Sequence, residues 1–292
     1  MGLAEQKLIQ TINARIQKRT IRVDGFSINY AVSGSGPALL LVHGLNIGWG
    51  QWHPNISELS KHFTVYAPDL PGAGESSRLN FLEADFNKDF VAILDKFIQS
   101  LNLQKLHFIG HSLAGWSGLK LAAQAKSYID KMVLVSSVGF TDYVPFQYKL
   151  ARYSLGAKIL SKTVFKPQRK NFENFVRSVF HENSEILPEF VDYFHETAAS
   201  DVSSNPVWLI HRMAKMFKEG KELILLEDLP KIRNKVLIIA GASDPLIPPK
   251  EVENSFKLLP NAKIKIFQRS GHVPNMEQPE DFNKEILNFL KD

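Results

Sequence analysis

Short apolar runs alternate with amphipathic stretches along most of the chain. Between the runs, apolar side chains recur every three or four residues, as at Phe90, Leu94 and Phe97, which is typical of helices with one buried face. Runs that are apolar throughout are typical of strands covered on both faces, so the pattern predicts an α/β protein with a mostly parallel sheet between helices. The strands predicted in this way, most of them apolar throughout, lie at residues 38–42, 63–67, 106–109, 132–135, 236–240 and 264–267.

The N-terminal end of this pattern differs from the rest. Residues 21–23 and 26–32 flank Asp24-Gly25, a pair that favours a tight turn, so a β-hairpin is expected there. Upstream, Leu8, Ile12 and Ile16 are spaced by four residues, which predicts an amphipathic helix over residues 3–19. Residues 1–19 are therefore expected to form an N-terminal segment that precedes the α/β core. Such a helix either lies on a membrane surface or packs on the domain, and its small apolar face favours packing.

The alternation breaks between residues 139 and 229. This stretch is rich in aromatic residues and helical spacing, and it contains no convincing strand. We therefore expect a helical cap, or lid, at 139–229, inserted into an α/β core formed by residues 20–138 and 230–292.

Composition narrows the function classes. The 292 residues carry a net charge of +5, but the basic residues are scattered in short runs, and this argues against a nucleic-acid-binding face. The chain has no cysteine, which excludes disulfides, thiolate metal sites and a cysteine nucleophile. No apolar stretch is long enough for an integral membrane segment, and no secretory signal is evident, so a cytoplasmic location is expected.

The strongest chemical signal is Gly110-His111-Ser112-Leu113-Ala114-Gly115, which follows an apolar strand and precedes a helix. This context is typical of a nucleophile elbow, in which a serine on a strained turn presents its hydroxyl above the sheet. The residues two before and two after the serine must be small, and here they are Gly110 and Ala114. Alanine departs from the usual glycine at the second of these positions.

A serine hydroxyl needs a base, and the base needs an orienting acid. His272 follows the last apolar run and Asp244 follows the one before it, and such loops meet at the carboxyl ends of parallel strands. We therefore expect Ser112, Asp244 and His272 to form the catalytic set, with Asp142 as the reserve acid. His111 is a poor base candidate, because neighbouring strand residues point to opposite faces.

Acyl transfer also needs hydrogen-bond donors for the developing oxyanion. The backbone N–H groups of Leu45, after the third predicted strand, and of Leu113, after the serine, are the expected donors. Three further side chains are candidate substrate contacts: Asn46 beside the oxyanion loop, Trp116 one turn after the serine, and His211 in the cap. Each also has an ordinary structural interpretation, as a loop residue or a buried packing residue.

Taken together, these motifs resemble the α/β-hydrolase superfamily from about residue 20 onward. The resemblance implies an eight-stranded, mostly parallel sheet with a helical cap, and the catalytic roles given above. It also implies architectural roles for Asp69, Gly72, Gly74 and Ser76. The motifs that carry it are His43-Gly44, Asp69-x-x-Gly72-x-Gly74-x-Ser76, the Ser112 elbow, Gly241-x-x-Asp244 and Gly271-His272.

A serine nucleophile favours a carboxylic-ester hydrolase acting on a small apolar or aromatic substrate through an acyl-enzyme. No metal or organic cofactor is expected, because no motif for one is present. Three alternatives remain open: a carbon–carbon bond hydrolase of ring-cleavage products, a small-molecule receptor with slow turnover, and a perhydrolase. The carbon–carbon hydrolase would need Arg152 or Arg212 to hold a substrate carboxylate. The oligomeric state is left open.

Overall fold

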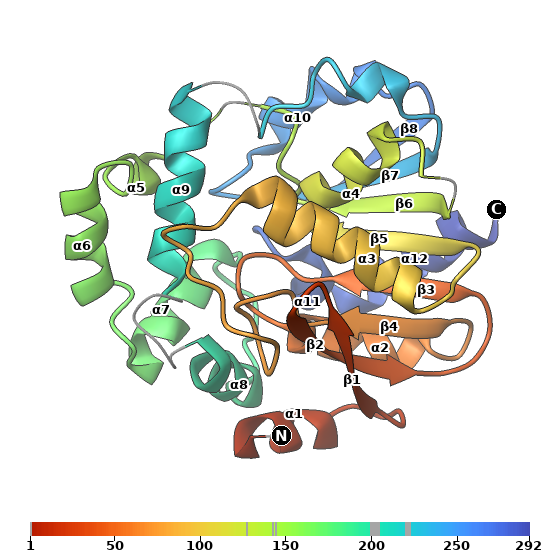
Figure 1. Ribbon diagram of the computed structural model, residues 1–292, viewed down its shortest axis with the longest axis horizontal. Coiled ribbons are helices and arrows are strands. Elements are labelled where there is room, and N and C mark those ends of the chain that lie inside the picture. Colours follow the sequence, from red (N-terminus) through yellow and green to blue (C-terminus); the bar gives the residue numbers. More distant parts are fainter. Residues whose placement is uncertain (1, 127, 142, 144, 199–204, 220–222) are drawn as a thin grey trace.

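The described part of the chain forms an eight-stranded sheet between layers of helices (Figure 1). The computed structural model describes residues 2–126, 128–141, 143, 145–198, 205–219 and 223–292. The strand order is β1-β2-β4-β3-β5-β6-β7-β8; β2 pairs antiparallel with both β1 and β4, and the other neighbours pair in parallel. The strands are β1 (Gln17–Val23), β2 (Phe26–Ser33), β3 (Ala38–Val42), β4 (Thr64–Pro68), β5 (Leu106–His111), β6 (Ile129–Val135), β7 (Lys235–Gly241) and β8 (Ala262–Phe267).

The helices divide between the core and the region that follows β6. In the core they are α1 (Leu3–Gln10), α2 (His53–Leu59), α3 (Ile93–Ser100), α4 (Leu113–Ala123), α10 (Pro249–Glu253), α11 (Pro274–Glu277) and α12 (Pro279–Lys291). Between β6 and β7 the chain forms α5 (Phe146–Lys149), α6 (Ser154–Lys162), α7 (Arg169–Val179), α8 (Pro188–Ala198) and α9 (Pro206–Glu219). Short 3-10 turns lie at Trp49–Trp52, Leu229–Lys231 and Phe256–Leu258, and a π-helical turn at Asn87–Ala92 leads into α3.

Two hydrophobic cores lie on the two faces of the sheet. Successive strand residues point to opposite faces, so Leu40 and Val42 of β3 pack in one core while Leu39 and Leu41 pack in the other. The first core includes residues of α3 and α4, and the second includes residues of α2 and α12. This arrangement confirms the runs of β3, β6 and β7 as strands that are buried on both sides, whereas β8, at the edge of the sheet, is partly exposed.

The hairpin is confirmed, but the N-terminal helix is shorter than expected. Asp24 and Gly25 both have positive φ, as the tight turn between β1 and β2 requires. The helix expected over residues 3–19 ends at Gln10, and β1 begins at Gln17. The reason is strand pairing, because Gln17 opposes Val32 and the ladder to β2 continues from there to the turn.

Helix α1 packs on the domain rather than standing free. Leu8 is fully buried, and the backbone N–H of Ala4 donates to Glu196 of α8 at 2.7 Å. The buried Glu5 carboxylate accepts hydrogen bonds from Trp49 and Lys18, each at 2.6 Å. The contacts therefore favour the interpretation of this segment as an end helix.

Helices α5 to α9 form a cap beyond the ends of the central strands (Figure 1). The core and the cap meet where β5, β6, β7 and β8 end, and the predicted site residues follow three of these strands. Within the described residues, no helix has the length and apolar character needed to cross a bilayer.

Candidate active site

Ser112 lies on a strained turn between β5 and α4. Its φ of 52° and ψ of −116° fall outside the regions that non-glycine residues normally adopt, as expected of a nucleophile elbow. The backbone N–H of Ser112 donates to Val135 of the neighbouring strand at 2.9 Å, which helps hold the turn. Gly110 must be glycine, because a Cβ there would lie 2.7 Å from the Ala114 carbonyl oxygen.

Asp244 and His272 are joined by hydrogen bonds. The Nδ1–H of His272 donates to the two carboxylate oxygens of Asp244 at 2.9 and 3.1 Å. Asp244 Oδ1 also accepts the backbone N–H groups of Leu246 and Ile247 at 2.8 and 2.9 Å, so the carboxylate itself is fixed. Both side chains are buried. The carboxylate thereby selects the tautomer that leaves Nε2 of His272 without a proton, as a general base requires.

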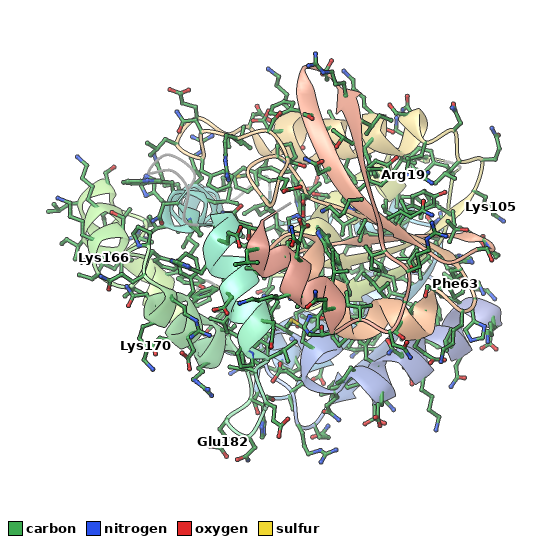
Figure 2. All side chains as sticks on the ribbon, turned by 90° about the horizontal axis from the view of Figure 1, so that it is seen from below. Arg19, Phe63, Lys105, Lys166, Lys170 and Glu182 are labelled. Carbon is green, nitrogen blue, oxygen red and sulfur yellow. The ribbon has the colours of Figure 1, made fainter. Side chains whose placement is uncertain are left out.

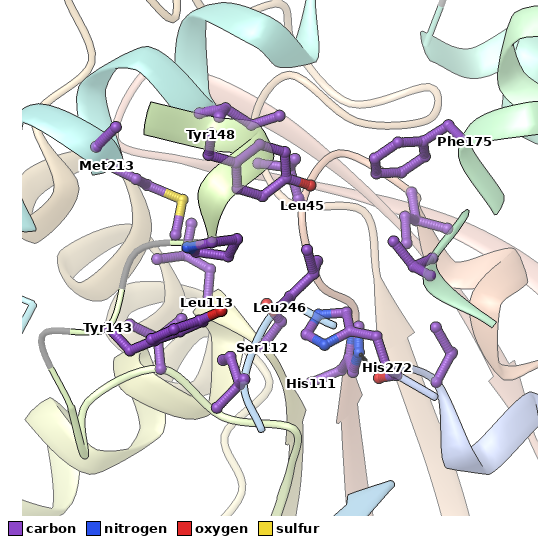
Figure 3. Close-up of a pocket in the computed structure, with 18 residues that line it drawn as sticks. Leu45, His111, Ser112, Leu113, Tyr143, Tyr148, Phe175, Met213, Leu246 and His272 are labelled. Atoms are coloured by element: carbon purple, nitrogen blue, oxygen red, sulfur yellow. Dashed lines mark hydrogen bonds between the residues drawn. The ribbon is translucent and has the colours of Figure 1, made fainter. Parts of the chain in front are cut away.

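Ser112 and His272 line the same pocket between core and cap (Figure 3). The volume that the centres of water-sized molecules can occupy in it is about 90 Å³. Loops after β3, β5, β7 and β8 form its floor, and α5, α7 and α9 supply cap residues to its wall. The lining residues are Leu45, Ile47, His111, Ser112, Leu113, Val138, Tyr143, Pro145, Tyr148, Phe175, Val179, Ile210, Met213, Ala214, Leu246, Ile247, His272 and Val273.

The two expected oxyanion donors also lie on this floor. Leu45 and Leu113 both line the pocket, and Leu113 is the first residue of α4, so the helix offers its N–H no carbonyl partner. The loop that carries Leu45 is held by His43, whose Nδ1–H donates to the Gly44 carbonyl and whose Nε2 accepts the N–H of Leu70. Burial lowers the pKa of His43 to about 4, against the opposing effect of the Gly44 hydrogen bond, so the ring is neutral at pH 7.

His111 borders the pocket but is bonded elsewhere. Its Nε2–H donates to the backbone carbonyl of His272 at 2.9 Å, and the two rings meet edge to face with centroids 4.8 Å apart. A Cβ on Gly44 would lie 2.3 Å from its Nδ1, so glycine at position 44 makes room for this ring. The imidazole therefore joins three loops of the floor: the oxyanion loop, the elbow and the histidine loop.

Sequence reasoning missed Glu277, which organises the histidine loop. Its carboxylate accepts the backbone N–H groups of Gly271 and Val273 at 2.9 and 3.1 Å, on either side of His272. It also accepts the N–H of His181, just beyond α7, at 2.6 Å. Next to this carboxylate, the N–H of His272 donates to the carbonyl of Val179 at 2.7 Å. The catalytic candidate is thus bonded to the cap as well as to Asp244.

The family comparison agrees with this architecture. A family model for the alpha/beta hydrolase fold matches residues 37–279, which is most of the chain. The chain belongs to the α/β-hydrolase fold family. The eight-stranded, mostly parallel sheet expected from the motifs is therefore confirmed.

The individual proteins that resemble the chain do not share one described activity. It is 26% identical to an uncharacterized protein of Mycobacterium tuberculosis, over 94% of this chain and 81% of that one. It is 24% identical to a 2-hydroxy-6-oxo-2,4-heptadienoate hydrolase of Pseudomonas putida, over 96% and 98%. The structure of carboxylesterase CesB from Bacillus subtilis superposes with a TM-score of 0.81 at 21% identity, covering 98% and 95% of the two chains.

Three predicted substrate contacts of this α/β-hydrolase are not among the residues that line the pocket. They are Asn46, Trp116 and His211, and all three are buried. Trp116 faces the helical layer, where it packs edge to face on Phe86. His211 is bonded through Nδ1 to the carbonyl of Ala151 within the cap. The reserve acid, Asp142, lies outside the described residues.

Proposed function

We propose that this α/β-hydrolase cleaves carboxylic esters with an apolar or aromatic group, using Ser112 as the nucleophile. The observation that carries the proposal is one pocket floor with a strained serine and a histidine that is hydrogen-bonded to a buried carboxylate. A serine, a base and an acid in that relation are what acyl transfer requires. The order of Ser112, Asp244 and His272 along the chain supports the same assignment.

The reaction proceeds in two halves. His272 takes the hydroxyl proton of Ser112 as the serine oxygen attacks the ester carbonyl carbon. The oxyanion that forms lies between the backbone N–H groups of Leu45 and Leu113. Asp244 stabilises the imidazolium, which then gives the proton to the departing alcohol. Water, deprotonated by His272, attacks the acyl-enzyme and releases the acid. One oxyanion donor is typically worth about 3 kcal/mol of barrier.

The wall of the pocket supports an apolar substrate. Among its described lining residues there is no Lys, Arg, Asp or Glu, and Phe175, Met213 and Ile210 face the space above the serine. Such a wall favours apolar acyl or alcohol groups, because a charged group entering it would lose its hydration and find no opposite charge there, only the hydroxyls of Tyr143 and Tyr148.

This wall also bears on the carbon–carbon hydrolase alternative. A dienoate substrate carries a carboxylate, and the arginines expected to hold it are bonded elsewhere. Arg212 donates to the Ala84 carbonyl at 2.8 Å and Arg152 to the Tyr153 hydroxyl at 2.6 Å, and neither lines the pocket. The similarity to the heptadienoate hydrolase keeps that activity as the competing outcome of the test.

The test is a panel of p-nitrophenyl esters of graded acyl length beside a ring-cleavage dienoate. We expect turnover of apolar esters, a loss of at least about 10³-fold in Ser112→Ala, and little change in Ser117→Ala, a buried serine of α4 outside the pocket. Ester turnover that survives Ser112→Ala overturns the nucleophile. Dienoate turnover without ester turnover overturns the substrate class.

A further inference from the structure

One segment of the cap has an unusual charge. Between Tyr143 and Phe172 the sequence contains seven of the chain's 35 basic residues and none of its 30 acidic residues. The excess of positive charge on this protein is therefore concentrated in one part of the cap, and the remaining chain is close to neutral. The seven residues are Lys149, Arg152, Lys158, Lys162, Lys166, Arg169 and Lys170.

Helix α6 presents apolar and basic residues together on its outer face. Leu155, Lys158, Ile159 and Lys162 follow the helical repeat and are all exposed, Leu155 at 71% and Ile159 at 48%. The opposite face carries buried Gly156 and Ala157 and packs toward α9. This is the reverse of an ordinary surface helix, because aliphatic side chains point to solvent between two lysines.

The neighbouring residues extend this face. Nine large hydrophobic side chains are exposed in the described part of the chain, and five of them lie between positions 150 and 164. Alongside Leu155 and Ile159 these are Leu150, Tyr153 and Val164. We call these five residues, with Lys158, Lys162 and Lys166, the outer cap face.

Among the described residues, no ion pair neutralises the lysines of the outer cap face. Arg169 and Lys170 lie near Glu173, but in the part of the chain that the structure describes Lys158, Lys162 and Lys166 make no ion pair. Figure 2 shows Lys166 and Lys170 at the extremity of the cap. In Figure 1, α6 lies on the outermost edge of the cap, separated from the sheet by α9.

We propose that the outer cap face docks on an anionic lipid surface. Aliphatic side chains flanked by lysines suit the boundary between acyl chains and headgroups, because the lysine stems extend so that their charges reach the anionic headgroups. Each lysine near such a surface is attracted electrostatically. Nucleic acid would satisfy the lysines but leave Leu155 and Ile159 uncovered. A symmetric second copy would place like charges opposite each other.

Docking at this face would bring the pocket close to the lipid. Helix α5, which supplies Tyr148 to the pocket wall, immediately precedes α6 along the chain. A membrane-bound ester would then be held near the cap, a consequence that rests on the proposed function, whereas the docking itself does not.

The docking test measures binding with catalysis switched off. Ser112→Ala protein is floated with vesicles of phosphatidylcholine alone and with about 30% phosphatidylglycerol added. We expect binding to the anionic vesicles only, weakened by salt. Adding Lys158→Glu and Lys162→Glu should weaken binding by at least about 25-fold, at about fivefold per lysine. Adding Leu155→Ser and Ile159→Ser should weaken it by at least about tenfold.

A matched pair of substitutions on the surface of the α/β core is the control for changing exposed residues in general. Lys257→Glu with Leu258→Ser also alters an exposed lysine and an exposed leucine, and it should leave binding within about twofold. In protein that retains Ser112, the cap substitutions should leave the turnover of a soluble short ester unchanged. Absence of binding to anionic vesicles, or equal binding by the cap variants and the control, overturns the proposal. A dimer in ultracentrifugation that the cap substitutions dissociate identifies a second copy as the occupant and likewise overturns it.

Discussion

The floor and the wall of the pocket are built in different ways. On the floor, Asp244, His272 and Glu277 each make more than one hydrogen bond, and backbone N–H groups supply many of the partners. On the cap side, Phe175 and Met213 contribute apolar surface, and α6 behind them exposes aliphatic side chains. Hydrogen bonds fix direction as well as distance, whereas apolar contacts fix mainly volume. The floor is therefore suited to defining the chemistry and the cap to selecting the substrate.

The largest effect on kcat should come from replacing Asp244, the acid on the pocket floor. Asp244→Asn keeps the size of the side chain but no longer fixes the tautomer of His272, so we expect kcat to fall by about 10⁴-fold. Steady-state kinetics on the best ester measure this, with Asp228→Asn, an ion-paired residue outside the pocket, as the control. A loss below about tenfold would show that Asp244 is not the orienting acid.

Acid should destabilise the floor through its buried neutral histidines. Burial lowers the pKa of His43 to about 4 in the folded protein, whereas the unfolded chain titrates near 6.5. The unfolded state therefore binds the proton first, and stability is lost as pH falls from 6.5 toward 4. This histidine alone should cost about 2 kcal/mol between pH 6.5 and 5. Urea unfolding should show a smaller loss in His43→Gln; an equal loss in both proteins contradicts the assignment.

Glu277 tests whether the floor depends on its bonds to the cap. Glu277→Ala leaves the N–H groups of Gly271, Val273 and His181 without their carboxylate, so we expect a stability loss of about 2 kcal/mol and a kcat loss of about 10-fold. Glu277→Gln, which keeps one accepting oxygen, should recover part of both. Thermal unfolding and kinetics measure the two effects beside the exposed control Glu280→Ala. An unchanged kcat in Glu277→Ala would show that Glu277 contributes to the stability of the fold and not to positioning His272.

The smallest effect should come from the wall. Phe175→Ala or Met213→Ala enlarges the pocket without touching the floor, so the preferred acyl chain should lengthen while kcat on a short ester changes by less than about fivefold. The ester panel measures this shift, and Phe289→Ala on α12, outside the pocket, is the control for Phe175. Equal losses for every chain length would show that these side chains support the floor instead.

How far the sequence anticipates the structure differs between these two regions. Strands such as β3 and β7 were predictable because fully apolar runs are distinctive, and Ser112 was singled out by its small neighbours and its strand-to-helix context. Asp244 and His272 were placed at one edge because parallel strands end together. Glu277 could not be recognised, since a glutamate becomes an organiser only when separate segments bring their N–H groups to it.

Other features depend on partners that a linear pattern does not contain. The helix expected over residues 3–19 is too long because residues 17–23 pair with β2 and the chain turns at residues 11–14 before that strand begins. Trp116 lies one turn after the serine, but the rotation of α4 turns it toward Phe86. Likewise the lysines of α6 look scattered along the chain, and only the folded cap shows that Leu155 and Ile159 emerge between them.

The central claim is that Ser112 is activated by His272 in this pocket. The most direct test is labelling with a fluorophosphonate, followed by intact mass and peptide mapping. We predict a single adduct on Ser112 in the wild-type protein, a labelling rate at least about 10³-fold lower in His272→Ala, and no adduct in Ser112→Ala. An adduct on another residue, or equally fast labelling without His272, contradicts the account.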